Sequence, residues 1–183
     1  GEGYRVVVSI DDNLEQYLQL EKRGSSLIIG LEPGRAYNLS NATLKAEITM
    51  PALAGARLSG AASMTVTGFE STTELELSLS GSSGLDGDIE AGDVQFDVSG
   101  SSEVSLTGSG QDATIDVSGS SRLDLSDFPV EDADVGASGA STVLVDVSGR
   151  LDARASGASN IRYLGDPTLG DLDTSGASSV EPE

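Results

Sequence analysis

The sequence predicts an all-β fold, a β-solenoid whose coils are about 19 residues long. A Ser-Gly step recurs along most of the chain, apolar residues flank each step at even offsets, and the composition suits a thin core. Hydrophobic residues make up 37% of the chain and aromatic residues only 4%, whereas glycine occurs 23 times. A core of small and β-branched side chains fits this composition better than a thick aromatic core.

The N-terminal segment has strand character with a weaker periodicity. Strand-like stretches occupy residues 4–10, 16–22, 27–31 and 43–50, and Arg23-Gly24-Ser25-Ser26 predicts a hairpin or a corner. Since the terminal repeats of a solenoid are usually atypical, we interpret residues 1–50 as degenerate first coils that form an irregular β cap. Residues 51–183 then hold the regular Ser-Gly coils, and residues 1–183 are predicted to form a single solenoid domain.

The repeat is marked by seven glycines, each preceded by serine and followed by two small residues. Successive glycines are 18 to 21 residues apart. This period is too short for a helix-pair repeat or a propeller blade, and the pattern of a leucine-rich repeat is missing. These corner glycines are Gly60, Gly81, Gly100, Gly119, Gly139, Gly157 and Gly176.

Apolar and polar residues alternate on both sides of each corner, as they do in a half-buried strand. Phe96 and Val98 precede Gly100, and Val104 and Leu106 follow it, all at even offsets. Each repeat is therefore predicted to contain a strand, a tight corner and a second strand. Equivalent strands of successive coils would pair in parallel about 4.8 Å apart, so six steps give a rod of roughly 29 Å.

The corner is predicted to be a scaffold and not a binding site. Glycine adopts backbone angles that other residues avoid, and small neighbours let the corners stack closely. The stacked serine hydroxyls are expected to bond to one another or to nearby backbone. We therefore assign no catalytic, cofactor-binding or metal-binding residue, and we regard the seven corner glycines as structural.

Charge and residue usage exclude several classes of function. Ten Lys and Arg against 30 Asp and Glu give a net charge of −20, which disfavours nucleic acid and anionic membranes as partners. The chain contains no cysteine and no histidine. Disulfides, thiolate nucleophiles, Cys/His zinc sites and imidazole-dependent triads are therefore excluded. No cofactor is expected beyond weak Ca²⁺ binding by surface carboxylates.

Binding is expected to use outward-facing residues that vary between the coils. Two such rows can be drawn across the predicted coils. One row comprises Glu76, Gln95, Thr114, Asp134, Asp152 and Asp171, and the other comprises Ser78, Asp97, Asp116, Gly136, Arg154 and Asp173. The expected function is non-enzymatic, with a protein or a glycan as the ligand.

Two alternatives remain open. If Asp97 and Asp116 align, they lie about 4.8 Å apart, close to the ~5 Å between the carboxylates of a retaining glycosidase, which suits a carbohydrate-active β-helix enzyme. Short corners and few aromatic residues argue against the groove that such an enzyme needs.

A calcium-binding structural protein would use the acidic rows and Asp86-Gly87-Asp88, yet the EF-hand loop and the Gly-Gly-x-Gly-x-Asp nonapeptide are both missing.

The order of these motifs resembles that of one bacterial family. Residues 49–53, Thr-Met-Pro-Ala-Leu, lead into Ala-Arg-Leu-Ser-Gly-Ala-Ala at 56–62, and Val-Ser-Gly-Ser-Ser and Ala-Ser-Gly-Ala-Ser units follow. Over nearly the whole chain they resemble the family named "putative auto-transporter adhesin, head GIN domain". The resemblance implies a right-handed parallel β-helix and a role in cell adhesion, and it carries over no catalytic or binding residue.

The same resemblance implies a location in the bacterial cell envelope, either periplasmic or exposed at the surface. Family members commonly carry a lipoprotein or secretory leader, which we expect to precede the present first residue. Contact with a membrane is expected only through such a leader or lipid anchor. Pairing of two copies through coil ends or a flat outward row is a further expectation.

Overall fold

The computed structural model describes residues 3–37, 39 and 42–183. The chain divides into two compact units, Gly1–Pro51 and Ala52–Glu183, which are described in turn. The division lies one residue from the boundary predicted between the N-terminal segment and the regular coils. That the two units act as one domain stays a prediction.

The first unit contains two antiparallel strand pairs. β1 (Arg5–Ile10) pairs with β4 (Leu44–Thr49), and β2 (Leu18–Arg23) pairs with β3 (Ser26–Leu31). A short 3-10 turn, η1 (Glu15–Tyr17), precedes β2. The β character of this segment is as predicted.

The strand pairing corrects the prediction of degenerate first coils in residues 1–50. Parallel coils need corners that carry the chain from one sheet to the other instead of back beside the same strand. Here the tight turn at Gly24, whose φ is 60°, folds β3 straight back beside β2. No Ser-Gly step occurs before Ser59-Gly60. The corner that joins the two strands of each coil in the rest of the chain is therefore missing from this segment.

The second unit is a parallel β-solenoid, in which each coil contributes an odd-numbered strand, a Ser-Gly corner and an even-numbered strand. The odd strands are β5 (Gly55–Leu58), β7 (Leu75–Leu79), β9 (Val94–Val98), β11 (Asp112–Val117), β13 (Asp132–Ala137), β15 (Arg150–Ala155) and β17 (Thr168–Thr174). The even strands are β6 (Ser63–Glu70), β8 (Gly84–Glu90), β10 (Glu103–Ser109), β12 (Arg122–Val130), β14 (Thr142–Val147), β16 (Asn160–Leu164) and β18 (Ser179–Pro182).

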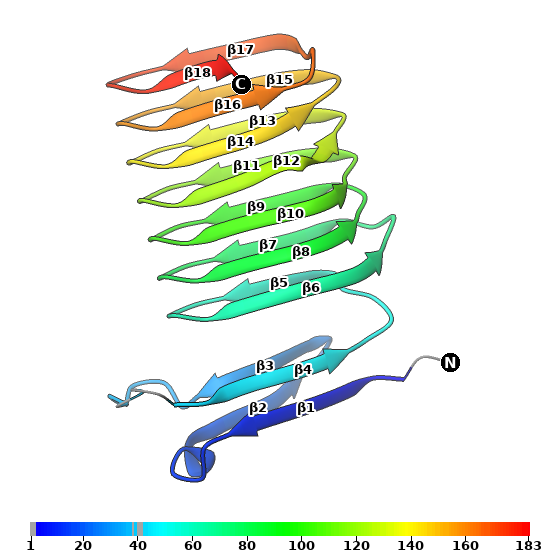
Figure 1. Ribbon diagram of the computed structural model, residues 1–183, viewed down its shortest axis with the longest axis vertical. Coiled ribbons are helices and arrows are strands. Elements are labelled where there is room, and N and C mark those ends of the chain that lie inside the picture. Colours follow the sequence, from blue (N-terminus) through cyan, green and yellow to red (C-terminus); the bar gives the residue numbers. More distant parts are fainter. Residues whose placement is uncertain (1–2, 38, 40–41) are drawn as a thin grey trace. The chain divides into compact units, whose positions relative to one another are not determined.

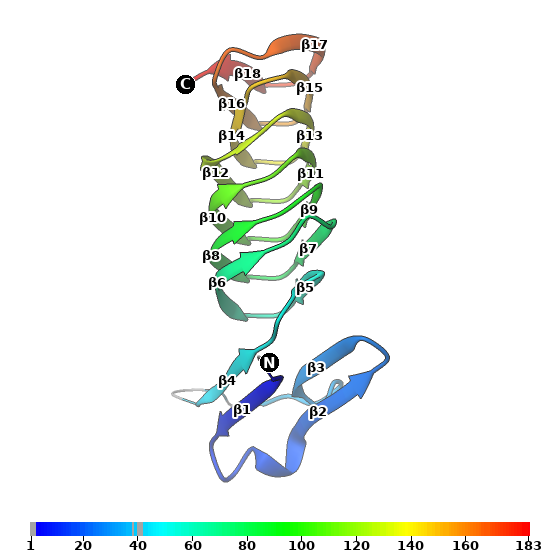
Figure 2. The same ribbon diagram turned by 90° about the vertical axis from the view of Figure 1, so that its right-hand side faces the viewer.

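Every strand of this unit pairs in parallel with the equivalent strand of a neighbouring coil. The result is two seven-stranded sheets, one odd and one even. In Figure 1 the chain runs leftwards along each rear, odd strand and rightwards along each front, even strand as it rises. This is the predicted right-handed sense. Figure 2 looks onto the side where each even strand leads into the next odd strand.

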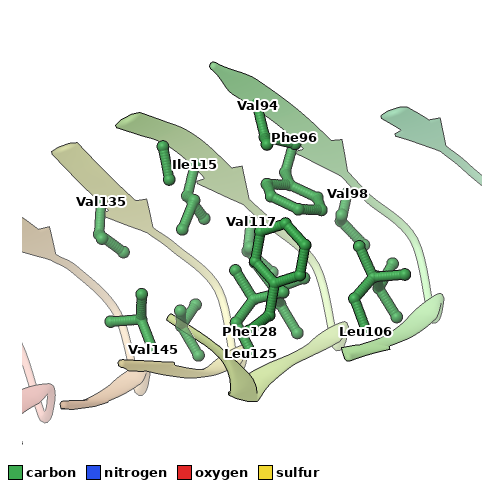
Figure 3. Close-up of a cluster of buried hydrophobic side chains, with 14 of the residues drawn as sticks. Val94, Phe96, Val98, Leu106, Ile115, Val117, Leu125, Phe128, Val135 and Val145 are labelled. Carbon is green, nitrogen blue, oxygen red and sulfur yellow. The ribbon is translucent and has the colours of Figure 1, made fainter. Parts of the chain in front are cut away.

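The core lies between the two sheets and is filled by alternate residues of each strand. β9 and β11 alternate between buried and exposed positions along their length, with Phe96 and Ile115 only 1% exposed. Figure 3 shows Phe96 and Phe128 entering the same interior from opposite sheets, surrounded by valines, leucines and an isoleucine. The core is thin and largely aliphatic, in agreement with the composition.

Differences in coil length are absorbed mainly away from the corner. In the coil between Gly119 and Gly139, the pairing of β12 with β14 jumps between Leu125 and Val130. Phe128, inside this bulge, is fully buried. The odd strands from β5 to β15 pair without a shift, so their outer face is the more regular of the two.

The last coil is less buried than the coils before it. Leu169 and Leu172 on β17 are 45% and 42% exposed, whereas Leu151 on β15 is fully buried. β17 and β18 each pair with one strand only. Their inward side chains are therefore covered by a neighbouring coil on one side alone.

Candidate functional site

The seven corner glycines lie between the two strands of each coil, with φ angles of 76° to 81°. Other residues are strained at these left-handed angles. The corners stack directly, since the residue after each glycine donates its N–H to the glycine carbonyl one coil earlier, as from Ser82 to Gly60 at 2.7 Å. A Cβ on Gly139 would lie 2.5 Å from the carbonyl oxygen of Gly119, whereas one on Gly60 would meet no atom within 4 Å.

The serines two positions after a corner glycine point into the core. The nearly fully buried ones are Ser83, Ser102, Ser121, Ser141 and Ser159. The Ser102 hydroxyl donates to the carbonyl of Ser99 at 2.9 Å and accepts the N–H of Ser83 at 3.3 Å. Within the described residues, no buried side-chain oxygen or nitrogen lacks a hydrogen-bond partner. Corner serines thus bond to the backbone as expected, although the sequence analysis did not identify which of them faces inward.

The two predicted rows lie on the outer face of the odd sheet. Ser78, Asp97, Asp116, Gly136, Arg154 and Asp173 are successive register partners. Glu76, Gln95, Thr114, Asp134 and Asp152 form the other row. Asp171 was expected to continue that row, but β17 bulges there, because Ala153 pairs with Leu172. The N–H of Asp171 instead donates to Oδ1 of Asp152 at 2.6 Å.

The basic residues of the second unit are all arginines, and each is paired with a carboxylate. Residues 52–183 contain five Arg, no Lys, and 23 Asp and Glu, a net charge of −18. The pairs are Arg57–Glu76 at 3.1 Å, Arg122–Asp124 at 2.9 Å, Arg150–Asp152 at 2.6 Å, Arg154–Asp134 at 3.1 Å and Arg162–Glu183 at 3.2 Å. Carboxylates thus dominate the field of the solenoid, which repels anions.

Asp152 joins β15 to β17 in one hydrogen-bond network. The Arg150 guanidinium donates to both of its oxygens, at 2.6 and 2.7 Å, and Asp171 donates its backbone N–H. These bonds favour the ionised form and lower the pKa of Asp152 to about 2. A Cβ on Gly170 would collide with Arg150 and Asp152, so the glycine makes room for the ion pair. The network explains the bulge at Asp171 and has a structural role.

A shallow depression of about 250 Å³ lies over Gly136 on the outer face of the odd sheet. Asp97 and Asp116 line it from the two preceding coils and Arg154 from the following coil. Asp97 and Asp116 are direct register partners, as the enzyme alternative requires, and both are exposed. These two carboxylates could be paired from the sequence, whereas the part that Gly136 and Arg154 play in the same depression is visible only in the structure. In the sequence, the depression is indicated by one glycine, Gly136, among residues with longer side chains in the same row.

The described residues hold no group of three or more acidic side chains arranged to bind a metal ion. Asp86 and Asp88, the pair considered for calcium, lie two residues apart on β8 and are exposed. The cross-strand partners of Asp88 are Thr67 and Thr107, and the Thr107 hydroxyl donates to Asp88 at 3.3 Å. Neighbouring coils thus place hydroxyls, and not further carboxylates, beside Asp88.

The relationship to known proteins agrees with these features. A family model described as "Putative auto-transporter adhesin, head GIN domain" matches residues 1–167. The chain belongs to this family. The resemblance inferred from the Ser-Gly units is thereby confirmed, and the family name indicates an adhesin-like protein of the surface or envelope. No curated protein matches the sequence.

Three solved structures share the fold. A "putative lipid binding protein" from Parabacteroides distasonis ATCC 8503 is 21% identical with a TM-score of 0.74, and the match covers 100% of this chain and 85% of that one. A "putative adhesin" from the same strain has 21% identity and a TM-score of 0.72, covering 98% and 84% of the two chains. A "putative adhesin" from Parabacteroides merdae ATCC 43184 has 17% identity and a TM-score of 0.72, covering 98% and 83%.

The likeness to these structures concerns the fold, because the identities are low. Their chains include the same solenoid architecture, and this likeness assigns no binding residue to the present chain. In the part of the chain that the structure describes, no helix is long and apolar enough to cross a membrane.

Proposed function

We propose that this family member is a non-enzymatic module of the bacterial cell envelope or cell surface that binds a protein or a glycan on the outer faces of its solenoid. The family name supports a surface role, and two of the solved relatives are described as putative adhesins. Stacked coils present rows of side chains about 4.8 Å apart, which suits contact with an extended partner.

The observation that carries this proposal is a filled interior combined with short corners. Leu77, Leu123 and Leu151 are fully buried between the sheets, so the side chains of the coils occupy the interior. The seven corner glycines are 18 to 21 residues apart, and no coil from Gly60 onward carries a long inserted loop that could wall a groove. A partner therefore has to be recognised by the outward rows.

The register of Asp97 and Asp116 is a specific observation in favour of an enzyme. Stacking at about 4.8 Å matches the carboxylate spacing of a retaining glycosidase. However, the two residues lie on an open sheet face, in a shallow depression without an aromatic residue in its lining. Nothing there excludes water from a reacting sugar. The enzyme is therefore the second candidate.

An array of glycans and extracellular-matrix proteins, probed with the full chain, tests the proposal. We expect saturable binding to a subset of the array, with the ligands recovered intact by mass spectrometry. Asp97→Asn and Asp116→Asn are compared with Asp86→Asn, a matched loss of one carboxylate on the other sheet. Sugar cleavage that is lost in the first two variants alone would establish the enzyme instead. Absence of binding to every element of the array would refute the interaction module.

A further inference from the structure

Gly136 leaves a gap in the outward row of the odd sheet. Its register partners are Asp116 on β11 and Arg154 on β15, and neither pairing contains a shift. Because neighbouring strands lie about 4.8 Å apart, the backbones that carry these two residues are roughly 10 Å apart. The floor of the depression between them is the bare backbone of β13.

The side chains of Asp116 and Arg154 both reach toward β13, Asp116 over Gly136 and Arg154 to Asp134. Oδ1 of Asp116 lies 2.6 Å from the point that a Cβ on Gly136 would occupy. On the other side, Nη1 of Arg154 donates to Oδ1 of Asp134 at 3.1 Å, which draws the guanidinium back toward β13. A guanidinium has five N–H donors, so donors remain beyond this bond. Among the described ion pairs, Arg154 joins Asp134 and not Asp116.

The depression thus places hydrogen-bond acceptors opposite donors. Asp97 and Asp116 supply carboxylate oxygens on the side of the earlier coils, and Arg154 supplies N–H groups on the side of the later coil. The Ser138 hydroxyl, also in the lining, can donate or accept. A ligand that fills the gap must therefore offer donors and acceptors close together.

Charge determines which ligand can use both sides. An anion is repelled by a solenoid with a net charge of −18. Arg154 does not attract a cation. Other carboxylates on the surface lie away from this arginine, so a cation has no preference for this depression. A neutral hydroxyl, in contrast, donates to a carboxylate and accepts from a guanidinium at the same time. Neighbouring hydroxyls on one ring satisfy both sides of the gap together.

We propose that the Gly136 depression is a binding site for a neutral sugar residue of a glycan, held by adjacent hydroxyls between Asp116 and Arg154. The proposal rests on the interaction module proposed above and names the glycan as its ligand. The lining lacks an aromatic platform, so a single site binds weakly, with a dissociation constant on the order of 1 mM. Several copies at a surface raise the avidity.

The test is an NMR titration of the ¹⁵N-labelled full chain with three neutral trisaccharides, maltotriose, cellotriose and mannotriose. We expect at least one of them to shift the amide signals of Gly136, Ala137 and Ser138 in a saturable manner. Gly136→Ala fills the gap, and because its Cβ meets chiefly the movable Asp116 carboxylate, the coil still folds. Gly136→Ala and Arg154→Gln should each weaken binding at least tenfold.

Gly84→Ala is the matched control. Gly84 also faces outward, on β8, and its Cβ would lie 3.9 Å from the nearest atom, Oγ of Ser63. Binding should be unchanged in this variant. Absence of a saturable shift with all three sugars, or binding that survives Gly136→Ala, would overturn the proposal. Shifts of the same signals by trilysine and not by the sugars would overturn it in favour of a cationic protein segment.

The array of glycans and matrix proteins distinguishes failure of the sugar site at Gly136 from failure of the interaction module. Wild-type protein that binds the array but shows no sugar-dependent shift at Gly136 refutes the depression as the site and leaves the module standing. Wild-type protein that binds nothing on the array refutes the module itself.

Discussion

Replacing corner glycines with alanine separates two reasons for their presence, backbone angle and close stacking. Gly139 and Gly60 have nearly the same φ, 80° and 78°. A Cβ on Gly139 would lie 2.5 Å from the Gly119 carbonyl oxygen, whereas a Cβ on Gly60 would have no neighbour within 4 Å. Gly60→Ala therefore measures the backbone angle alone, and Gly139→Ala measures the angle together with the collision.

The expected magnitudes follow from these contacts. A left-handed backbone angle costs alanine about 1–2 kcal/mol, and this cost applies at both positions. At Gly139 the obstructing atom belongs to the backbone and cannot rotate away, so overpacking adds roughly 1–3 kcal/mol. Gly139→Ala should therefore lose about 2–5 kcal/mol, a large share of the 5–15 kcal/mol that is typical for a folded domain.

Urea unfolding followed by circular dichroism measures both variants against the wild type. Hydrogen exchange of the amides in β11 to β14 shows in addition whether the loss at Gly139 is local to its coil. Equal destabilisation by the two substitutions would refute the argument from stacking. A Gly139→Ala variant as stable as the wild type would refute both parts of it.

Three further predictions concern the hydrogen bonds and charges of the solenoid. Ser102→Ala should cost about 1–3 kcal/mol in urea unfolding, because it leaves a buried N–H and carbonyl without their partner. The exposed Ser101→Ala should change stability by less than about 0.5 kcal/mol, and equal effects would contradict the burial argument. Asp152 has a folded pKa of about 2 against an ordinary value of 3.8, so its ionised form stabilises the fold above about pH 4 and this contribution disappears as the pH falls through about 2. The melting-temperature advantage of the wild type over Asp152→Asn should accordingly be present at neutral pH and disappear below about pH 2, and an advantage independent of pH would contradict the assignment. CaCl₂ should raise the melting temperature no more than MgCl₂ at equal ionic strength, and a calcium-specific rise would reveal a structural site.

The regular part of the fold could be predicted because one short period determines it. A corner glycine with even-offset apolar neighbours defines two strands and their inward faces, and Phe96 and Ile115 are buried accordingly. The outward rows follow from the same alignment, including the pairing of Asp97 with Asp116. The N-terminal unit carries no such corner, and its antiparallel pairing depends on a tight turn at Gly24.

The features that the sequence analysis missed depend on contacts between coils. The bulge at Asp171 forms because its N–H bonds to Asp152, one coil earlier. The Gly136 depression requires Arg154 from the following coil, held toward β13 by Asp134. Neither contact has a signature within a single repeat, because each depends on residues that differ between the coils.

The stacking of one coil per corner glycine underlies every other conclusion, and distances between spin labels test it most directly. The chain has no native cysteine, so labels on introduced cysteines are unambiguous. The exposed corner positions Ala61, Ser82 and Ala177 are labelled in pairs as Ser82→Cys with Ala177→Cys and Ala61→Cys with Ala177→Cys. Five and six coil steps predict narrow distributions centred near about 24 Å and 29 Å. Broad distributions, or distances that do not grow by one strand spacing per coil, would contradict the solenoid.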